Sequence, residues 1–480
     1  MPPGAALSAG AAAPFMTSIL GKTLPRTILS QTRRENSPCY HELSMPGFAD
    51  LLRRNRNYRY AWMGQVVSEI GDYFNNIAVF ALVMEKGGSG LVVSGVMLSR
   101  AIPAVLAGPV AGVVLDRLDR KHIMIASDLV RAALALAFVL TIHQPRPWLL
   151  YALSGALMFA SPFFTSGRAA ILPTITSADE LHAANSLTQT TGWATLTAGT
   201  LLAGFSAARF GYQWAFIINA LSFVFSAAAI WRISRPGGFR ARREDAGRDR
   251  APTAAHKVAG AWREYADGLA YLRSVPLMMG IAMISVGWAM GGGAAQILFA
   301  LFGEQVFHRG AAGIGSIWGF AGIGLLIGGA FGHLAGRRVG FGGYKRTVTV
   351  SYVLHGAAYM LFSQVESYAA ALVWMMLSRV GMAVTSVLNN SQLLRHTPDR
   401  YRGRVFATME SLRWSVMILS MAGAGIACQF VGPRTIGLAA GAFGTLTAVG
   451  WGWLDWSGRL PEPTTERATV DVLEIPDSTA

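Results

Sequence analysis

The chain is short of charge and of cysteine. Asp, Glu, Lys and Arg make up 14% of its 480 residues, whereas about 25% is usual in soluble domains. A soluble protein of this length would need a polar surface that this composition does not supply. The two cysteines imply neither a disulfide framework nor a metal site, because Cys39 lies in a polar segment and Cys428 in an apolar one.

Motifs that mark common enzymes are also missing. The chain has no phosphate-binding loop of the Gly-x-x-x-x-Gly-Lys-Ser/Thr type, no nucleophile elbow and no cluster of metal ligands. We therefore expect no enzyme activity, no cofactor and no bound metal. Any work that the chain performs would draw on an ion gradient or on the gradient of a substrate.

Long apolar runs are what the chain does have. Hydrophobic residues make up 52% of it and the mean hydropathy is +0.38, with runs of about 20 residues, the length of a helix that crosses a bilayer. The net charge of +15 could indicate nucleic-acid binding. The basic residues, however, lie in short segments between the apolar runs, as in the cytoplasmic loops of membrane proteins. We therefore expect an all-α polytopic membrane protein with no nucleic-acid partner.

The apolar runs form two groups of six. We expect about twelve transmembrane helices, near residues 58–84, 89–115, 122–142, 147–167, 183–208, 211–232, 276–302, 311–336, 346–363, 367–390, 404–430 and 433–456. The chain then divides into five segments: a disordered leader at 1–50, an N-terminal six-helix half at 51–232, a cytoplasmic linker at 233–274, a C-terminal six-helix half at 275–456 and a polar cytoplasmic tail at 457–480.

The leader has a composition of its own. It is rich in Ala, Pro, Ser and Thr and has no acidic residue before Glu35, which resembles an organellar transit peptide. A disordered tail, or a translation start at Met45, would explain the same composition. Whether residues 1–44 occur in the mature protein stays open at this stage.

Basic connections alternate with nearly uncharged ones. Arg117, Arg120 and Lys121 follow the second apolar run, whereas the short segment 85–88 after the first run carries one acid and one base. If successive helices alternate in direction, every basic connection falls on the same side of the membrane. The positive-inside rule then places both termini in the cytoplasm of a plasma (inner) membrane protein.

The connection after the second run carries a charged motif. It consists of Gly112, Asp116, Arg117, Arg120 and Lys121. The motif resembles the signature Gly-x-x-x-Asp-Arg-x-Gly-Arg-Arg/Lys of the major facilitator superfamily, with Asp119 in place of the second glycine. This resemblance implies two six-helix halves that rock about a site between them.

The resemblance also implies a conformational gate. Asp116 would contact the other half in the outward-facing state and release it as the halves rock. The alternative is a positive-inside loop with one incidental acid. The second half repeats the spacing, from Gly332 to Arg337, but has Gly336 where the acid would lie. The gate would therefore be one-sided.

Further segments resemble the efflux branch of this superfamily that includes the enterobactin exporter and macrolide exporters. They are Ser68–Asp72, Ala101–Pro103, Leu172–Pro173, Ala184–Leu187, Phe216–Phe223 and Arg402–Phe406. The resemblance covers about residues 50–456. The glycine motif of drug antiporters is imperfect, since Gly199 and Gly204 are present but Thr200 replaces the proline.

Two acids lie inside the first predicted helix. Glu69 and Asp72 are three residues apart and so lie near one helical face. A charge within the bilayer costs a few kcal/mol or more and usually lines a cavity. Either acid is a candidate for proton coupling. The alternative is a structural ion pair with an arginine such as Arg100 or Arg131.

Other charges fall within predicted helices. The candidates for cavity charges are Arg100, Arg379, Glu410 and Arg413. Glu410 and Arg413 are three residues apart, so they could instead form an intrahelical pair. Asp128 and Arg131 have the same spacing, and a structural pair is the preferred interpretation there.

Glycine is abundant, with 54 residues. Many lie in the eighth predicted helix between Gly313 and Gly332, where they predict a face for close helix contact. Three consecutive glycines, Gly291–Gly293, weaken the seventh helix by about 1 kcal/mol each relative to alanine. They predict either a hinge or a site of close packing.

We expect a secondary active exporter of small amphipathic molecules or drugs, acting by alternating access as a monomer in the lipid bilayer. Exchange against a proton gradient is the expected energy source. The alternatives are a metabolite, siderophore or lysolipid carrier of the same fold, and a transport-inactive membrane sensor or assembly partner. The buried acids favour a transporter, because an idle bundle has little reason to keep them in the bilayer.

Overall fold

The computed structural model describes residues 48–144, 147–234, 239 and 265–463. Every regular element in those residues is helical. Most of the predicted leader, linker and tail lies outside the described residues. A short helix, α1 (Phe48–Arg54), precedes the first long one.

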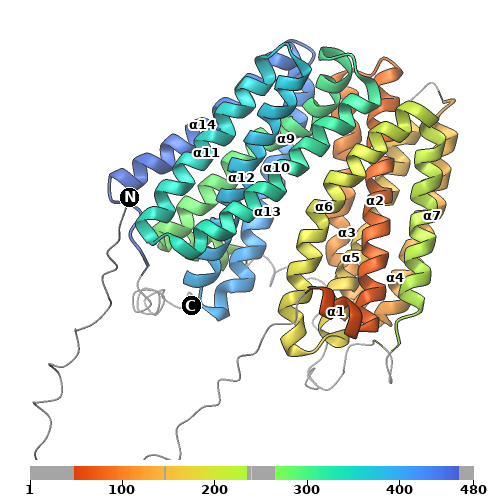
Figure 1. Cartoon of the computed structure of the whole chain (residues 1–480), viewed down its shortest axis with the longest axis horizontal. Coiled ribbons are helices and arrows are strands. Elements are labelled where there is room, and N and C mark those ends of the chain that lie inside the picture. The colour runs from red at the N-terminus through yellow and green to blue at the C-terminus, as the bar shows by residue number, and fades with distance from the viewer. Residues whose placement is uncertain (1–47, 145–146, 235–238, 240–264, 464–480) are drawn as a thin grey trace, which may run out of the picture. The chain divides into compact units, whose positions relative to one another are not determined.

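In the described part of the chain, the long helices form two groups of six (Figure 1). The first contains α2 (Arg56–Glu85), α3 (Gly90–Arg117), α4 (Arg120–Ala137) with its continuation η1 (Phe138–Thr141), α5 (Trp148–Ile175), α6 (Ala178–Phe210) and α7 (Tyr212–Trp231). The second contains α9 (Pro276–Leu301) with its continuation η3 (Phe302–Val306), α10 (Gly310–Arg338), α11 (Phe341–Gln364), α12 (Tyr368–His396), α13 (Asp399–Ala427) and α14 (Pro433–Trp456). The all-α polytopic class is confirmed.

Each group packs as a bundle. In the first bundle α2 packs against α6 and α7, and α3 against α5; in the second, α11 packs against α12 and α14, and α9 against α13. Eight of the long helices are apolar enough, over their length, to cross a membrane. The other four, α6, α11, α13 and α14, have no stretch of 18 residues that is as apolar, and they complete the bundles.

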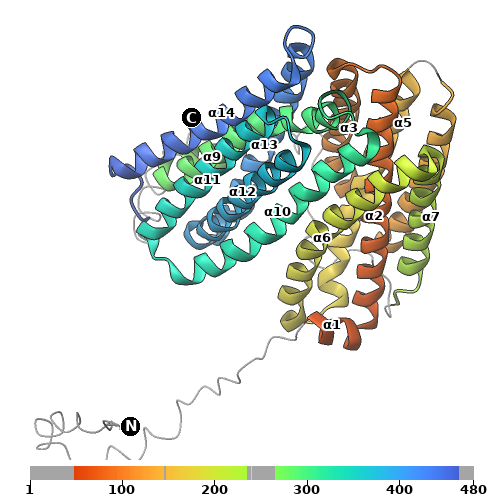
Figure 2. The same ribbon diagram turned by 45° about the horizontal axis from the view of Figure 1, so that its top comes forward.

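The most extensive contacts between the bundles are those of α6 with α10 and of α3 with α13 (Figure 2). Glycine allows the first contact: a Cβ at Gly315 would lie 2.5 Å from the carbonyl oxygen of Thr200, and one at Gly204 would lie 2.9 Å from that of Ala311. In the second contact, Ser94 Oγ donates to the Met421 carbonyl at 2.9 Å. The contact of Gly315 with α6 confirms the predicted glycine face of the eighth helix, α10.

Some helices begin or end at other residues than predicted. The prediction used hydropathy, whereas capping residues set where these helices begin or end. The fourth predicted helix ended at 167, but α5 continues to Ile175. The fifth was predicted from 183, but α6 begins at Ala178 because Ser177 and Glu180 form a reciprocal capping box. Hydropathy marks the part of a helix within the bilayer, and these helices continue beyond it.

The three glycines of α9 do not interrupt that helix. A Cβ at Gly293 would lie 2.5 Å from the carbonyl oxygen of Met417, and one at Gly291 would lie 2.8 Å from that of Ala440. Of the two predictions for this segment, close packing is therefore the one that the structure supports.

Candidate functional site

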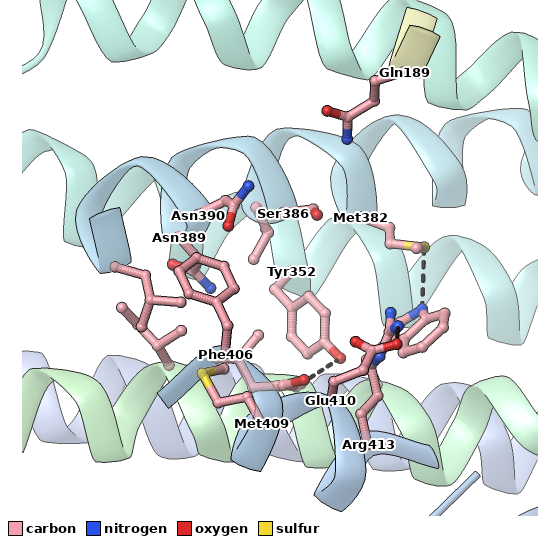
Figure 3. Close-up of a pocket in the computed structure, with 16 residues that line it drawn as sticks. Gln189, Tyr352, Met382, Ser386, Asn389, Asn390, Phe406, Met409, Glu410 and Arg413 are labelled. Carbon is pink, nitrogen blue, oxygen red and sulfur yellow. Dashed lines mark hydrogen bonds and ion pairs between the residues drawn. The ribbon is translucent and has the colours of Figure 1, made fainter. Parts of the chain in front are cut away.

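A cavity of about 400 Å³ lies along the second bundle (Figure 3). Its walls come from α9, α11, α12 and α13, and Gln189 of α6 points into it from the other bundle. The lining residues are Gln189, Ile281, Ile284, Ser285, Trp288, Tyr352, Met382, Thr385, Ser386, Asn389, Asn390, Leu393, Phe406, Met409, Glu410 and Arg413. Apolar and aromatic walls with a few polar groups are typical of sites for small molecules.

Two of the three amides of the cavity, Asn389 and Asn390, come from one stretch of α12, and the third is Gln189 of α6. Asn389 is buried and accepts a hydrogen bond from Tyr344 Oη at 2.9 Å, which fixes its side chain. Asn390 and Ser386 are exposed and face the space around Gln189. This wall can exchange hydrogen bonds with a ligand without changing its own packing.

Glu410 and Arg413 form the predicted intrahelical ion pair. The Glu410 carboxylate also accepts a hydrogen bond from Trp414 Nε1 at 2.8 Å. The Arg413 guanidinium lies 5.6 Å from the ring centre of Trp288 on α9. Both charged residues line the cavity as well, so the ion pair forms part of the cavity wall.

Arg379 does not line this cavity. It is buried in α12 with 7% of its surface exposed, and it lines a second, smaller space between α9, α11, α12 and α14. Its Nη1 atom donates a hydrogen bond to the Met382 sulfur at 3.4 Å. Its guanidinium also lies 5.3 Å from the ring centre of Phe299.

In the first bundle Glu69 is held by three partners. Arg168 of α5 lies 3.5 Å away, Gln65 donates to the carboxylate at 2.8 Å and Thr195 donates at 2.7 Å. The structure thus gives Glu69 the structural arginine pair that was the alternative to proton coupling, but the arginine is Arg168 and neither of the two examples, Arg100 and Arg131. Arg168 was missed because the predicted helix ended one residue before it.

Asp72 is different. Its Oδ1 atom is buried and receives no hydrogen bond from the described residues. Arg100 and Arg131 are the cations that act on it electrostatically. Each has another partner: Arg100 donates to Asn75 Oδ1 at 3.5 Å, and Arg131 pairs with Asp128. The Asp128–Arg131 pair is confirmed, and the Arg131 guanidinium also stacks 4.3 Å from the ring centre of Phe223.

The basic part of the charged motif ties the ends of the first bundle together. Arg120 donates to the Ala170 carbonyl at 3.0 Å. Lys121 Nζ donates to the carbonyls of Trp231 at 2.7 Å and Ile233 at 2.8 Å. These bonds join the start of α4 to the ends of α5 and α7.

Asp119, which departs from the signature, is the N-cap of α4. It accepts from the backbone N–H groups of Lys121 at 3.0 Å, His122 at 3.3 Å and Phe239 at 3.1 Å. Burial raises the pKa of Asp119, but these N–H groups outweigh burial and lower its pKa below the ordinary value.

The first part of the motif, from Gly112 to Arg117, lies apart from Arg120 and Lys121. Asp116 and Arg117 are exposed at the end of α3. A Cβ added at Gly112 would meet no atom within 4 Å, so close packing does not explain that glycine in this conformation. The structure does not test the gate, which stays a prediction.

Among the described residues, no group of three or more His, Cys, Asp or Glu side chains could hold a metal ion.

Similarity to known proteins agrees with this geometry. The chain is 27% identical over 427 residues to the MFS-type transporter YfiS of Bacillus subtilis, covering 83% of this chain and 94% of that one. It is 22% identical to the putative bacilysin exporter BacE of Bacillus subtilis, over 74% of this chain and 84% of that one. Macrolide efflux protein A of Streptococcus pyogenes matches at 31% identity, over 25% of this chain and 30% of that one.

Solved transporter structures share the fold. A bacterial homologue of the iron transporter ferroportin in the inward-facing state superposes with a TM-score of 0.59 at 17% identity, over 82% of this chain and 98% of that one. A peptide transporter of the POT family gives a TM-score of 0.62 at 13% identity, over 85% and 98%. The sequence model of the Major Facilitator Superfamily matches residues 61–421. The chain therefore belongs to the major facilitator superfamily of membrane transporters.

Proposed function

We propose that this transporter exports small amphipathic molecules across the inner membrane in exchange for protons. Similarity to a putative bacilysin exporter and to a macrolide efflux protein supports export. The cavity beside α12 and α13 is the candidate substrate site, because it joins aromatic walls to amides and one ion pair.

The observation that carries proton coupling is Asp72. Its Oδ1 atom is buried and receives no hydrogen bond from the described residues. An unsatisfied buried charge is costly, and protonation of Asp72 would lower that cost. Glu69, in contrast, is stabilised as a carboxylate by Arg168, Gln65 and Thr195. We therefore assign the proton to Asp72, with Glu69 as the neighbouring fixed charge.

The structure supports alternating access. The bundles meet near Gly90 and Cys428, where a Cβ at Gly90 would lie 2.4 Å from Cys428 Cβ. The cavity lining extends toward the opposite end, to Leu393 and Phe406. The basic connections lie at that opposite end, so the positive-inside rule makes it cytoplasmic and the conformation inward-facing. Exposure of Asp116 fits a gate that is released in this conformation.

The test is transport into proteoliposomes with an imposed pH gradient, using ethidium, rhodamine 6G and dansyl-leucine as fluorescent probes. The wild type should accumulate at least one probe, and an uncoupler should abolish the accumulation. Asp72→Asn should insert normally and lose the effect of the gradient. The matched control is Asp179→Asn, at an exposed position in the first turn of α6. Accumulation by Asp72→Asn at the wild-type level would refute the assignment.

A further inference from the structure

Arg379 is a buried cation without a carboxylate partner among the described residues. Three charged residues of the second bundle lie well away from helix ends, Arg379, Glu410 and Arg413. Glu410 and Arg413 neutralise each other. One positive charge therefore remains in the interior of this bundle, on Arg379.

The aromatic rings around Arg379 offset only part of its cost. Its guanidinium lies 5.3 Å from the ring centre of Phe299 and 5.9 Å from that of Tyr359. Each such contact contributes about 0.5–2 kcal/mol, and the Met382 sulfur is a weak acceptor. Removing an ion from water costs several kcal/mol in real proteins. The burial of Arg379 without a counter-charge is explained if an anion binds to it during function.

Arg379 lines a small chamber between α9, α11, α12 and α14. This chamber has a volume of about 10 Å³, close to the space of one water molecule. Glycines of α9 and α14 form two of its walls, and His355 forms a third. His355 Nδ1 lies 2.8 Å from Ser378 Oγ and 3.1 Å from the Ser378 carbonyl, and these contacts fix the ring.

Two side chains separate the chamber from the substrate cavity. Trp288 lines both spaces, and Met382 lines the cavity. The Met382 sulfur accepts from Trp288 Nε1 at 3.1 Å and from Arg379 Nη1 at 3.4 Å (Figure 3 shows Met382 at the Glu410 end of the cavity). Both are weak, replaceable contacts, and methionine changes rotamer easily.

We propose that Arg379 binds the carboxylate of an amphipathic substrate whose apolar body lies in the cavity, once Trp288 and Met382 move aside. This inference rests on the proposed function, because it assigns the substrate class of the same cavity. Arg379 would thus select acidic or zwitterionic amphipaths over lipophilic cations. An inorganic anion such as chloride offers the same chemistry, and the experiment separates the two.

The experiment measures binding, not transport, in lipid nanodiscs. The probes are dansyl-leucine and its uncharged amide, which differ only at the carboxylate. The wild type should bind dansyl-leucine at least tenfold more tightly than the amide. Arg379→Met should bring the two affinities within twofold, whereas Arg379→Lys should keep part of the preference. Arg346→Met, at an exposed position in α11, is the matched control and should keep all of it.

Thermal unfolding supplies a second measurement. Without ligand, Arg379→Met should unfold at the same or a higher temperature than the wild type, because it removes a buried unpaired charge. A merely structural cation would give a lower unfolding temperature. Replacing chloride by gluconate in the buffer tests whether the anion that binds Arg379 is chloride.

Three results would overturn the inference. One is an unchanged preference for dansyl-leucine in Arg379→Met. Another is no binding of dansyl-leucine by the wild type up to its solubility limit. The third is a chloride-dependent unfolding temperature, lost in Arg379→Met, with no carboxylate preference. Failure of proton coupling alone would leave the carboxylate preference intact, so the two proposals fail separately.

Discussion

At the scale of single residues, the interior acids of the first bundle have three different environments. Asp128 pairs with Arg131 and is fully buried. Glu69 has an arginine, an amide and a hydroxyl around it. Asp72 has a buried oxygen without a described hydrogen bond. From these environments we infer that Asp128 is a structural charge, whereas Asp72 can gain and lose a proton.

The environments predict opposite stability effects for two similar substitutions. Asp128→Asn leaves Arg131 buried and unpaired, and breaking such a pair costs about 3–5 kcal/mol. Asp72→Asn removes a charge whose buried Oδ1 atom receives no hydrogen bond from the described residues, so it should leave stability unchanged or slightly raised. Thermal unfolding of both variants in nanodiscs checks this. Equal losses of unfolding temperature would contradict the distinction.

At the scale of elements, side chains at helix ends connect the bundle in ways that hydropathy does not show. The apolar runs predicted the number and order of the long helices. They did not predict that α5 extends to Ile175, and so they missed Arg168 as the partner of Glu69. They identified Arg379 as a buried charge, but its chamber depends on the packing of α9, α11 and α14, which a single sequence does not specify.

Asp119 provides a prediction at this scale. Its pKa is lowered in the folded state, so it contributes stability above its unfolded pKa of about 3.9 and loses it as the pH falls through the lower folded value. Asp119→Ala should cost about 1 kcal/mol, as for other N-caps. Unfolding temperatures measured from pH 8 downward should show a constant difference from the wild type to about pH 4. A difference that disappears between pH 8 and pH 6 would exclude the capping role.

At the scale of the whole molecule, the two bundles divide the work. The first holds the proposed proton carrier on α2, and the second holds the cavity and Arg379. They meet through α6 with α10 and α3 with α13. Coupling would then come from rocking of one bundle against the other, with no direct contact between Asp72 and the substrate.

The charged motif gives the corresponding prediction. If Asp116 contacts the second bundle only in the outward-facing state, Asp116→Asn should shift the population toward the inward-facing conformation. Spin labels at the exposed Leu118 and Leu394, with distances measured by pulsed electron resonance, should report a larger share of the longer separation. Glu366→Gln, at an exposed position in the connection between α11 and α12, is the matched control and should leave the distances as in the wild type. An unchanged distance distribution in Asp116→Asn would reduce the motif to a positive-inside loop.

Proton release on substrate binding tests the central claim most directly. Purified protein in weakly buffered nanodiscs is mixed with the probe that it transports, and a pH-sensitive dye records the protons released. We predict that the wild type releases protons, that Asp179→Asn does the same and that Asp72→Asn releases none. Equal release from Asp72→Asn and the wild type would show that another group carries the proton.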